Sequence, residues 1–254
     1  MKGRLFLVPT PLDHGCAEQT PLDDVLPLGT IKKAAAIACW ISENAKSTRA
    51  FLKRVDALVP LAQPIQTQQI TELPREVHKK GDHAGAARFD ARPLLAPALQ
   101  GQDVGLISEA GMPAVADPGS SVVRAAHQLG IEVLPLTGPV SLLLALAASG
   151  LNGQNFAFTG YLPQDASART TQIQQISRAV QQSGQTRIVI ETPYRNQVLL
   201  EALLSGLDGQ LRLCVASGLT LPDADGARSA SVAEWRQARW PVTPKAPAVF
   251  LIGR

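Results

Sequence analysis

The chain alternates short apolar runs with longer segments of helical periodicity along most of its 254 residues. Short apolar runs bounded by turn residues are typical of buried strands, and apolar residues at helical spacing are typical of amphipathic helices. Strands are expected at residues 5–8, 37–41, 104–107, 131–136, 156–158, 187–190, 211–216 and 248–252. Helices are expected at residues 120–129, 140–149, 166–183, 197–204 and 231–239. This alternation predicts an α/β fold with a largely parallel sheet.

The composition indicates a folded protein of a reducing compartment. Hydrophobic residues make up 45% of the chain and charged residues 18%, which excludes the disordered class. The net charge of +3 gives little support to a non-specific nucleic-acid binder. Cys16, Cys39 and Cys214 form no metal or disulfide pattern. The most apolar stretch, 140–148, is shorter than the roughly 18 residues of a membrane helix, so we expect a cytoplasmic protein without a membrane partner.

Glycines and prolines cluster at the carboxyl ends of several expected strands. Nine of the 20 glycines and 19 prolines lie in the segments 9–11, 108–119, 137–139 and 191–195. Ligands of open α/β sheets bind beyond these strand ends. Glycine permits close approach of the backbone to a ligand, and proline stiffens the loop. The pattern therefore favours a small-molecule site, and the segment 108–119 is expected to be a nearly helix-free loop.

The polar segment 63–85 has two possible interpretations. Its composition predicts a long, solvated surface loop. The alternative is a mobile segment near a substrate, because functional residues concentrate on loops held by a rigid scaffold.

Several common chemistries lack their sequence patterns. The chain contains no G-x-x-x-x-G-K-[ST] for phosphate binding, no G-x-G-x-x-G after a strand and no G-x-S-x-G nucleophile elbow. The four histidines are dispersed and show no metal-ligand spacing. We therefore expect no metal site.

The strand-end segments resemble, in order, those of a known family. They are G-R-L-F-L-V-P-T-P at 3–11, G-L-I-S-E-A-G-M-P at 105–113, A-D-P-G at 116–119, V-L-P-L-T-G-P at 133–139, and the run from A-S-G-L at 148–151 to F-T-G-Y-L-P at 158–163. The sequence is similar to the tetrapyrrole-methylase-like, S-adenosylmethionine-dependent methyltransferases. Within them it most resembles the small-subunit ribosomal RNA cytidine 2′-O-methyltransferase I type, as a divergent paralogue. The similarity spans nearly the whole chain.

This resemblance implies two α/β domains with a methyl-donor cleft between them, within a homodimer. The domains are expected at 1–137, with a mostly parallel sheet, and at 138–254. The residues implied to bind S-adenosylmethionine are Pro9, Gly111, Met112, Pro113, Val115, Ala116, Val140, Ser141, Glu191, Ala216, Pro247 and Ala248.

The chain departs from the RNA-methylating branch mainly at charged positions. S-E-N-A-K at 42–46 replaces A-E-D-T-R, I-E-T-P-Y-R at 190–195 replaces Y-E-S-x-H-R, and segment 216–221 lacks the charges of R-E-L-T-K. The glycine and proline framework remains. The resemblance thus implies methyl transfer to ribosomal RNA, with two alternatives: a tetrapyrrole or other small-molecule acceptor, or a donor-binding relative without catalysis.

Transfer of a methyl group from a sulfonium is an in-line displacement. Orientation of the two reactants can contribute roughly 7–11 kcal/mol. A ribose hydroxyl also gains about 10²–10⁴-fold from a general base. Glu43 and Glu109 are the candidate catalytic residues, and Lys46 and Arg195 are candidates to bind substrate phosphate. The alternative is that Glu43 is a solvated strand-end charge and Glu109 a structural hydrogen-bonding residue of its loop.

Overall fold

The protein consists of two compact units. The computed structural model describes residues 1–254 apart from 14, 75–88, 223–225, 239 and 241–246. Unit 1 comprises Met1–Gly15 and Gln19–Val140, and unit 2 comprises Cys16–Glu18 and Ser141–Arg254. The domain limits 1–137 and 138–254 stay a prediction. Each unit is described separately below.

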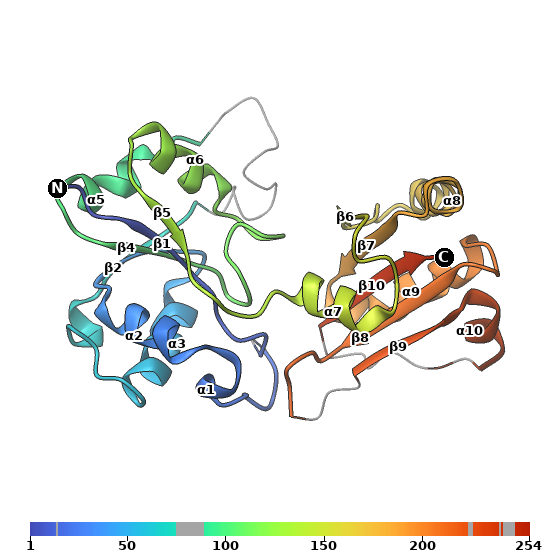
Figure 1. The fold of residues 1–254 in the computed structure, drawn as a ribbon, viewed down its shortest axis with the longest axis horizontal. Helices are drawn as coiled ribbons and strands as arrows, with labels where there is room; N and C mark the ends of the chain where they lie inside the picture. Colours follow the sequence, from blue (N-terminus) through green and yellow to red (C-terminus); the bar gives the residue numbers. More distant parts are fainter. Residues whose placement is uncertain (14, 75–88, 223–225, 239, 241–246) are drawn as a thin grey trace. The chain divides into compact units, whose positions relative to one another are not determined.

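Unit 1 contains a five-stranded parallel sheet (Figure 1). The strands are β1 (Leu5–Val8), β2 (Cys39–Ser42), β3 (Gln69–Glu72), β4 (Val104–Ile107) and β5 (Val133–Pro135). Their order is β3-β2-β4-β1-β5, and each neighbouring pair is parallel. The predicted parallel sheet of the amino-terminal half is therefore present.

Helices cover both faces of this sheet (Figure 1). Helices α1 (Leu22–Val25), α2 (Leu28–Ala36) and α3 (Ala45–Asp56) share a core with Phe6 and Trp40. The short helix η2 (Arg92–Leu95), α5 (Ala96–Leu99) and α6 (Ser120–Gln128) share a second core with Leu5 and Ile41. Adjacent strand residues point to opposite faces, so both faces of these apolar strands are buried. Gly105 is required on β4, because a Cβ there would lie 2.6 Å from the Trp40 ring.

The chain leaves the neighbouring strands β1 and β4 toward opposite faces. After β1 it continues into α1 and α2, and after β4 it continues into α6 on the other face. A crevice is expected beyond the carboxyl ends of strands at such a switch point. Thr10 and Gly111 exchange two backbone hydrogen bonds of 3.0 Å, which join the two diverging loops.

Unit 2 contains a five-stranded mixed sheet (Figure 1). Its strands are β6 (Phe156–Gly160), β7 (Thr186–Glu191), β8 (Arg212–Ser217), β9 (Gly226–Ser231) and β10 (Ala248–Gly253), in the order β6-β7-β10-β8-β9. Only β6 and β7 pair in parallel; β10 is antiparallel to both neighbours, and β9 is antiparallel to β8. The expectation of a largely parallel sheet is therefore wrong here. Residues 218–225 between β8 and β9 are too few for a parallel crossover.

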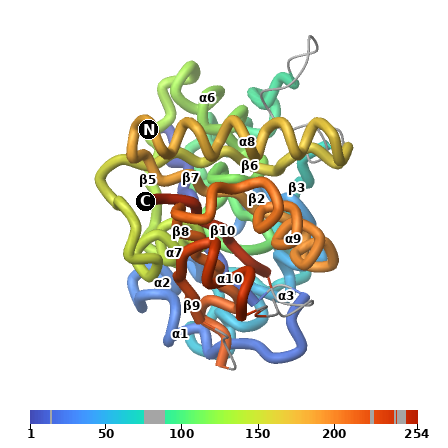
Figure 2. The backbone as a smooth tube through the Cα atoms, turned by 90° about the vertical axis from the view of Figure 1, so that its right-hand side faces the viewer, coloured from blue at the N-terminus to red at the C-terminus, as the bar shows by residue number. Residues whose placement is uncertain are grey.

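Three helices of unit 2 share one core with its sheet. They are α8 (Ala166–Ser183), α9 (Asn196–Gly206) and α10 (Val232–Ala238), packed around Trp235 and Phe250. The 18-residue α8 is conspicuous in Figure 2. Helix α7 (Ser141–Ser149) instead packs against β8, β9 and β10 outside that cluster. The short helix η3 (Pro193–Arg195) follows β7.

The sequence pattern missed the helices α1, α2 and α3 and the polar edge strands β3 and β9. Strand β3 lies inside the segment 63–85, where a surface loop was expected, and follows the short helix η1 (Ile65–Thr67). Residues 75–85 of that segment lie outside the described residues. Strands β3 and β9 are edge strands of their sheets. Strand β3 is mostly exposed and β9 buries only Ala230, so neither has the apolar run of a buried strand. Strand β2 begins at Cys39 rather than at 37, because Ile37 ends α2.

The segment 108–119 has no helix, as expected. None of the helices among the described residues has the length and apolar character needed to cross a membrane.

Candidate functional site

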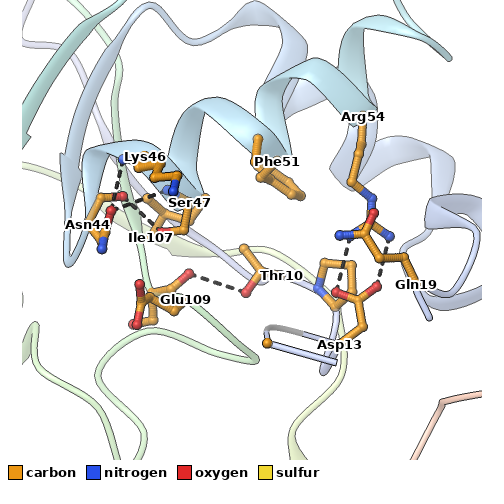
Figure 3. A pocket seen from close by; sticks show the side chains of 14 residues that line it. Thr10, Asp13, Gln19, Asn44, Lys46, Ser47, Phe51, Arg54, Ile107 and Glu109 are labelled. Atoms are coloured by element: carbon orange, nitrogen blue, oxygen red, sulfur yellow. Dashed lines mark hydrogen bonds and ion pairs between the residues drawn. The ribbon is translucent and has the colours of Figure 1, made fainter. Parts of the chain in front are cut away.

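A polar pocket of about 370 Å³ lies in unit 1, at the carboxyl ends of β1, β2 and β4 (Figure 3). Its walls come from the loop after β1, from α3 and from the end of β4. The lining residues are Thr10, Pro11, Asp13, Gly15, Gln19, Asn44, Lys46, Ser47, Ala50, Phe51, Arg54, Ile107, Ser108 and Glu109. Two of the predicted site residues, Lys46 and Glu109, are thus brought together here.

The amino-terminal end of α3 forms one wall of the pocket. Asn44 caps the helix: its side-chain Oδ1 accepts hydrogen bonds from the backbone N–H of Lys46 (2.9 Å) and Ser47 (3.3 Å). Glu72 at the end of β3 accepts from the N–H of Ala45 at 2.6 Å. These bonds satisfy N–H groups that have no partner within a helix. They fix the first turn of α3, and with it the backbone of Lys46.

A buried ion pair forms the opposite end of the pocket. Arg54 of α3 donates two hydrogen bonds to the carboxylate of Asp13, at 3.1 and 3.0 Å (Figure 3). Asp13 also accepts from the N–H of Thr20, and Arg54 donates to the carbonyl of Thr20 at 2.6 Å. The Asp13 side chain is only 5% exposed. A bidentate arginine pair has a defined geometry, so it holds the loop after β1 against α3.

Three carboxyl groups gather beside the pocket. The backbone N–H of Glu109 donates to Glu43 Oε2 at 3.3 Å. Burial, together with the negative charges of Glu43 and Glu109, raises the pKa of Asp117 to about 7. Asp117 therefore changes its charge near neutral pH. The predicted catalytic residues Glu43 and Glu109 lie close together, and the structure adds Asp117 to them.

The loop 108–119 has an unusual backbone. Ala114 and Ala116 adopt φ angles of 65° and 64°, in the left-handed region that non-glycine residues rarely occupy. Gly111 also has a positive φ of 76°, and a Cβ there would lie 3.2 Å from Leu12. Strained backbone of this kind is concentrated at ligand sites.

Only some of the loop residues that were expected to meet the methyl donor are accessible. Val115 and Ala116 are exposed, whereas Gly111 and Pro113 are buried. Small side chains on an accessible loop allow a ligand to approach the backbone. The residues present therefore fit a donor that is bound partly through backbone groups. Pro9 packs close to Gly138, where a Cβ would lie 2.3 Å from its ring, and Val140 ends unit 1.

In unit 2, several residues expected to bind the donor lie together where β7 and β8 end and β10 begins. Ala248 of β10 pairs with Glu191 of β7 on one side and with Ser217 of β8 on the other. Pro247 accepts a hydrogen bond from the N–H of Gly218 at 3.1 Å. The Ser217 hydroxyl is buried and has no hydrogen-bond partner within the described part of the chain, so a ligand could supply one. Ala216 is buried in β8, and Ser141 begins α7.

Arg195 forms an ion pair inside unit 2. Its Nε lies 3.3 Å from Glu191 Oε2, and these side chains are 20% and 7% exposed. Glu191 also accepts from the N–H of Thr192 at 2.8 Å. Arg195, which was expected to bind substrate, is therefore paired with Glu191, which was expected to bind the donor.

Sequence reasoning missed Asp13, Arg54 and Asp117. Asp117 lies in the A-D-P-G segment that carried part of the resemblance, so its position was a usable signal. Asp13 and Arg54 are 41 residues apart and had no such signal. In the described part of the chain, no three or more His, Cys, Asp or Glu side chains are arranged to hold a metal ion.

Comparison with known proteins places the chain in a family. Residues 28–229 match the sequence model of the Tetrapyrrole (Corrin/Porphyrin) Methylases. The chain belongs to the tetrapyrrole methylase family. This confirms the predicted family, the methyltransferase class and the dependence on S-adenosylmethionine.

Relatives of the chain include proteins named ribosomal RNA small subunit methyltransferase I. The protein from Pseudomonas aeruginosa is 34% identical over 224 residues, which are 86% of this chain and 67% of that protein. The protein from Mesorhizobium japonicum is 40% identical over 132 residues, which are 52% of this chain and 44% of that protein. The aligned part of the chain therefore spans between 44% and 67% of the length of these relatives.

Solved structures of the family share the fold. The native uroporphyrin III C-methyltransferase from Thermus thermophilus aligns with a TM-score of 0.54 at 19% identity, covering 99% of this chain and 98% of that one. A structure of the Thermus enzyme complexed with S-adenosylhomocysteine gives the same TM-score, identity and coverage. These similarities confirm the predicted α/β fold class.

Proposed function

We propose that this chain transfers a methyl group from S-adenosylmethionine to a ribose 2′-hydroxyl of ribosomal RNA. The observation that carries the proposal is the placement of Glu109 and Lys46 in one polar pocket of unit 1, with Glu43 and Asp117 beside it. The names of the relatives from Pseudomonas and Mesorhizobium support the choice of ribosomal RNA. Such a substrate places the protein in the cytoplasm.

In this proposal each polar group has one role. The 2′-hydroxyl of the acceptor loses its proton to the carboxylate cluster, with Glu109 nearest to the pocket and Glu43 behind it. Lys46 holds a phosphate of the same nucleotide. The loop 108–119 of unit 1 is proposed to bind the methyl donor. When bound, the donor supplies the electrophilic methyl group. The residues around Ala248 and Ser217 in unit 2, and Arg195 as a substrate residue, remain separate proposals.

The carboxyl groups of Glu43, Glu109 and Asp117 support a ribose acceptor. A ribose hydroxyl is neutral and needs a proton acceptor, which these side chains provide. The chain is further proposed to act as a homodimer, which light scattering of the purified protein measures directly.

Radiolabelled methyl transfer tests the proposed acceptor. The purified chain is incubated with labelled S-adenosylmethionine and, in parallel, with 30S subunits, naked ribosomal RNA and a small-molecule extract. Label is expected in ribosomal RNA, and nuclease digestion followed by mass spectrometry is expected to find it on a ribose. Label in the small-molecule extract alone would rule out an RNA substrate.

Replacement of Glu109 tests the proposed base. Glu109→Gln is expected to lower kcat by about 10²–10⁴-fold, because the hydroxyl proton loses its acceptor, while the Kd of S-adenosylhomocysteine stays unchanged. Glu132→Gln is the matched control, since Glu132 is an exposed residue of unit 1 outside the pocket. Full turnover by Glu109→Gln would contradict the role given to this side chain.

A further inference from the structure

Helix α3 has two adjacent functional faces. Ser47, Ala50 and Arg54 are on the face that lines the pocket, together with Lys46 and Phe51. A second set of side chains, at helical spacings of three and four residues, lies beside this face. At about 100° per residue, Lys46, Arg49 and Lys53 fall within roughly 60° of arc. Lys46 belongs to both faces, so the second face borders the pocket.

The second face is an exposed basic stripe. Lys46, Arg49 and Lys53 are all exposed, and none of their side chains has an ion pair among the described residues. Arg54 is not part of the stripe, because its guanidinium forms an ion pair with Asp13. The basic stripe spans about 10 Å along the helix, at 1.5 Å per residue. Three unpaired cations in a row form a track of positive charge.

Acidic residues are confined to the two ends of α3. Glu72 contacts the N–H of Ala45 at its start, Glu43 precedes the cap, and Asp56 is its last residue. The positive charge of the stripe therefore extends from Lys46, near the start of the helix, to Lys53. The small net charge of the chain conceals this local concentration, since attraction of a polyanion depends on where the cations lie.

We propose that the basic stripe of α3 binds the phosphate backbone of a single-stranded RNA segment and so presents one of its nucleotides to the pocket. This inference rests on the proposed RNA substrate and names the element that recognises it. A pocket of about 370 Å³ accommodates a single nucleotide rather than a duplex. A single strand also leaves its ribose accessible, which a reaction at the 2′-hydroxyl requires.

Salt-dependent RNA binding tests the stripe. A short, fluorescein-labelled, single-stranded oligoribonucleotide of mixed sequence is titrated with the full chain between about 50 and 200 mM salt, and anisotropy gives the Kd. Each lost phosphate contact reduces the slope of log K against log salt by about 0.7 for a single strand. Arg49→Gln is expected to weaken binding about two- to fivefold, and Arg49→Gln/Lys53→Gln by the product of two such factors.

Arg124→Gln is the matched control. Arg124 is an exposed arginine of α6, which packs on the opposite face of the unit 1 sheet from α3. Its replacement removes the same charge and is expected to change neither the Kd nor the salt slope. In methyl-transfer assays with ribosomal RNA, the double variant is expected to raise KM and leave kcat and Tm unchanged.

The outcomes separate this inference from the proposed function. If the wild-type chain methylates RNA while the double variant binds it with the Kd and salt slope of Arg124→Gln, the proposed role of the basic stripe is contradicted. The proposed function is then unaffected. If the wild-type chain neither binds the oligoribonucleotide nor methylates RNA, the proposed function falls, and the stripe with it.

Discussion

Asp117 is the residue whose chemistry depends most on its surroundings. Burial, together with the charges of Glu43 and Glu109, raises its pKa to about 7, against an ordinary value of 3.8. Above pH 7 the carboxyl group is charged in both the folded and the unfolded chain. In the folded chain, burial and the neighbouring negative charges make this charged form unfavourable and lower the stability. Below about pH 4 it is neutral in both. The stability of the folded protein is therefore expected to fall as pH rises from about 4 to about 7.

Asp117→Asn is expected to remove this pH dependence. The variant should be more stable than the wild type at pH 8.5, on the order of a few kcal/mol, because the buried charge is gone. Near pH 4 the difference should largely vanish. Urea unfolding at the two pH values measures the effect, and Asp24→Asn, at an exposed position of α1, serves as control. An equal gain at both pH values would contradict the assigned pKa.

At the scale of the element, α3 supplies five of the fourteen residues that line the pocket. Its inner face buries Thr48, Phe51, Leu52 and Val55, and its outer face carries the basic stripe. The orientation of both faces depends on where the helix begins. Asn44 and Glu72 determine that point through hydrogen bonds to the first N–H groups.

Asn44→Ala is expected to lower the free energy of unfolding by about 1 kcal/mol, within a range of 0.5–2 kcal/mol, because the N–H groups of Lys46 and Ser47 lose their acceptor. Asn44→Asp keeps an acceptor oxygen and should retain stability. The same Asp variant should weaken RNA binding, since it adds a negative charge next to Lys46. Chemical denaturation and anisotropy measure the two effects. A wild-type stability for Asn44→Ala would show that Glu72 alone suffices as a cap.

At the scale of the whole molecule, binding of the donor product and folding are thermodynamically linked. A ligand that binds only the folded chain stabilises it in proportion to the logarithm of its concentration. The donor product is therefore expected to stabilise the complete protein.

S-adenosylhomocysteine at a hundred times its Kd is expected to stabilise the chain by about 2.7 kcal/mol and to raise Tm accordingly. Thermal scans over a concentration series measure the shift, and adenosine at the same concentrations is the control ligand. Ser217→Val should reduce the shift, because it replaces a buried hydroxyl that has no hydrogen-bond partner among the described residues. A Tm that does not depend on S-adenosylhomocysteine would contradict the proposed donor site.

Local sequence patterns determined the elements with strong apolar periodicity. The strand predicted at 104–107 and the helix predicted at 166–183 have the limits of β4 and α8. Glycine and proline marked the loop 108–119, because a backbone with positive φ angles and no helix needs such residues nearby. The edge strands β3 and β9 escaped detection, since an exposed strand carries no apolar run.

The sequence by itself also determined the family and named Glu43, Glu109 and Lys46 as candidates. Only the tertiary structure decided which distant residues meet. The strand order β2-β4-β1 brings Glu43 and Glu109 together across 66 residues, and the return of α3 onto the sheet brings Arg54 to Asp13 across 41. No local pattern encodes such contacts, because they depend on which strands pair and on which face each helix packs. The pKa of Asp117 follows from the same packing, since burial and neighbouring charges exist only in the folded chain.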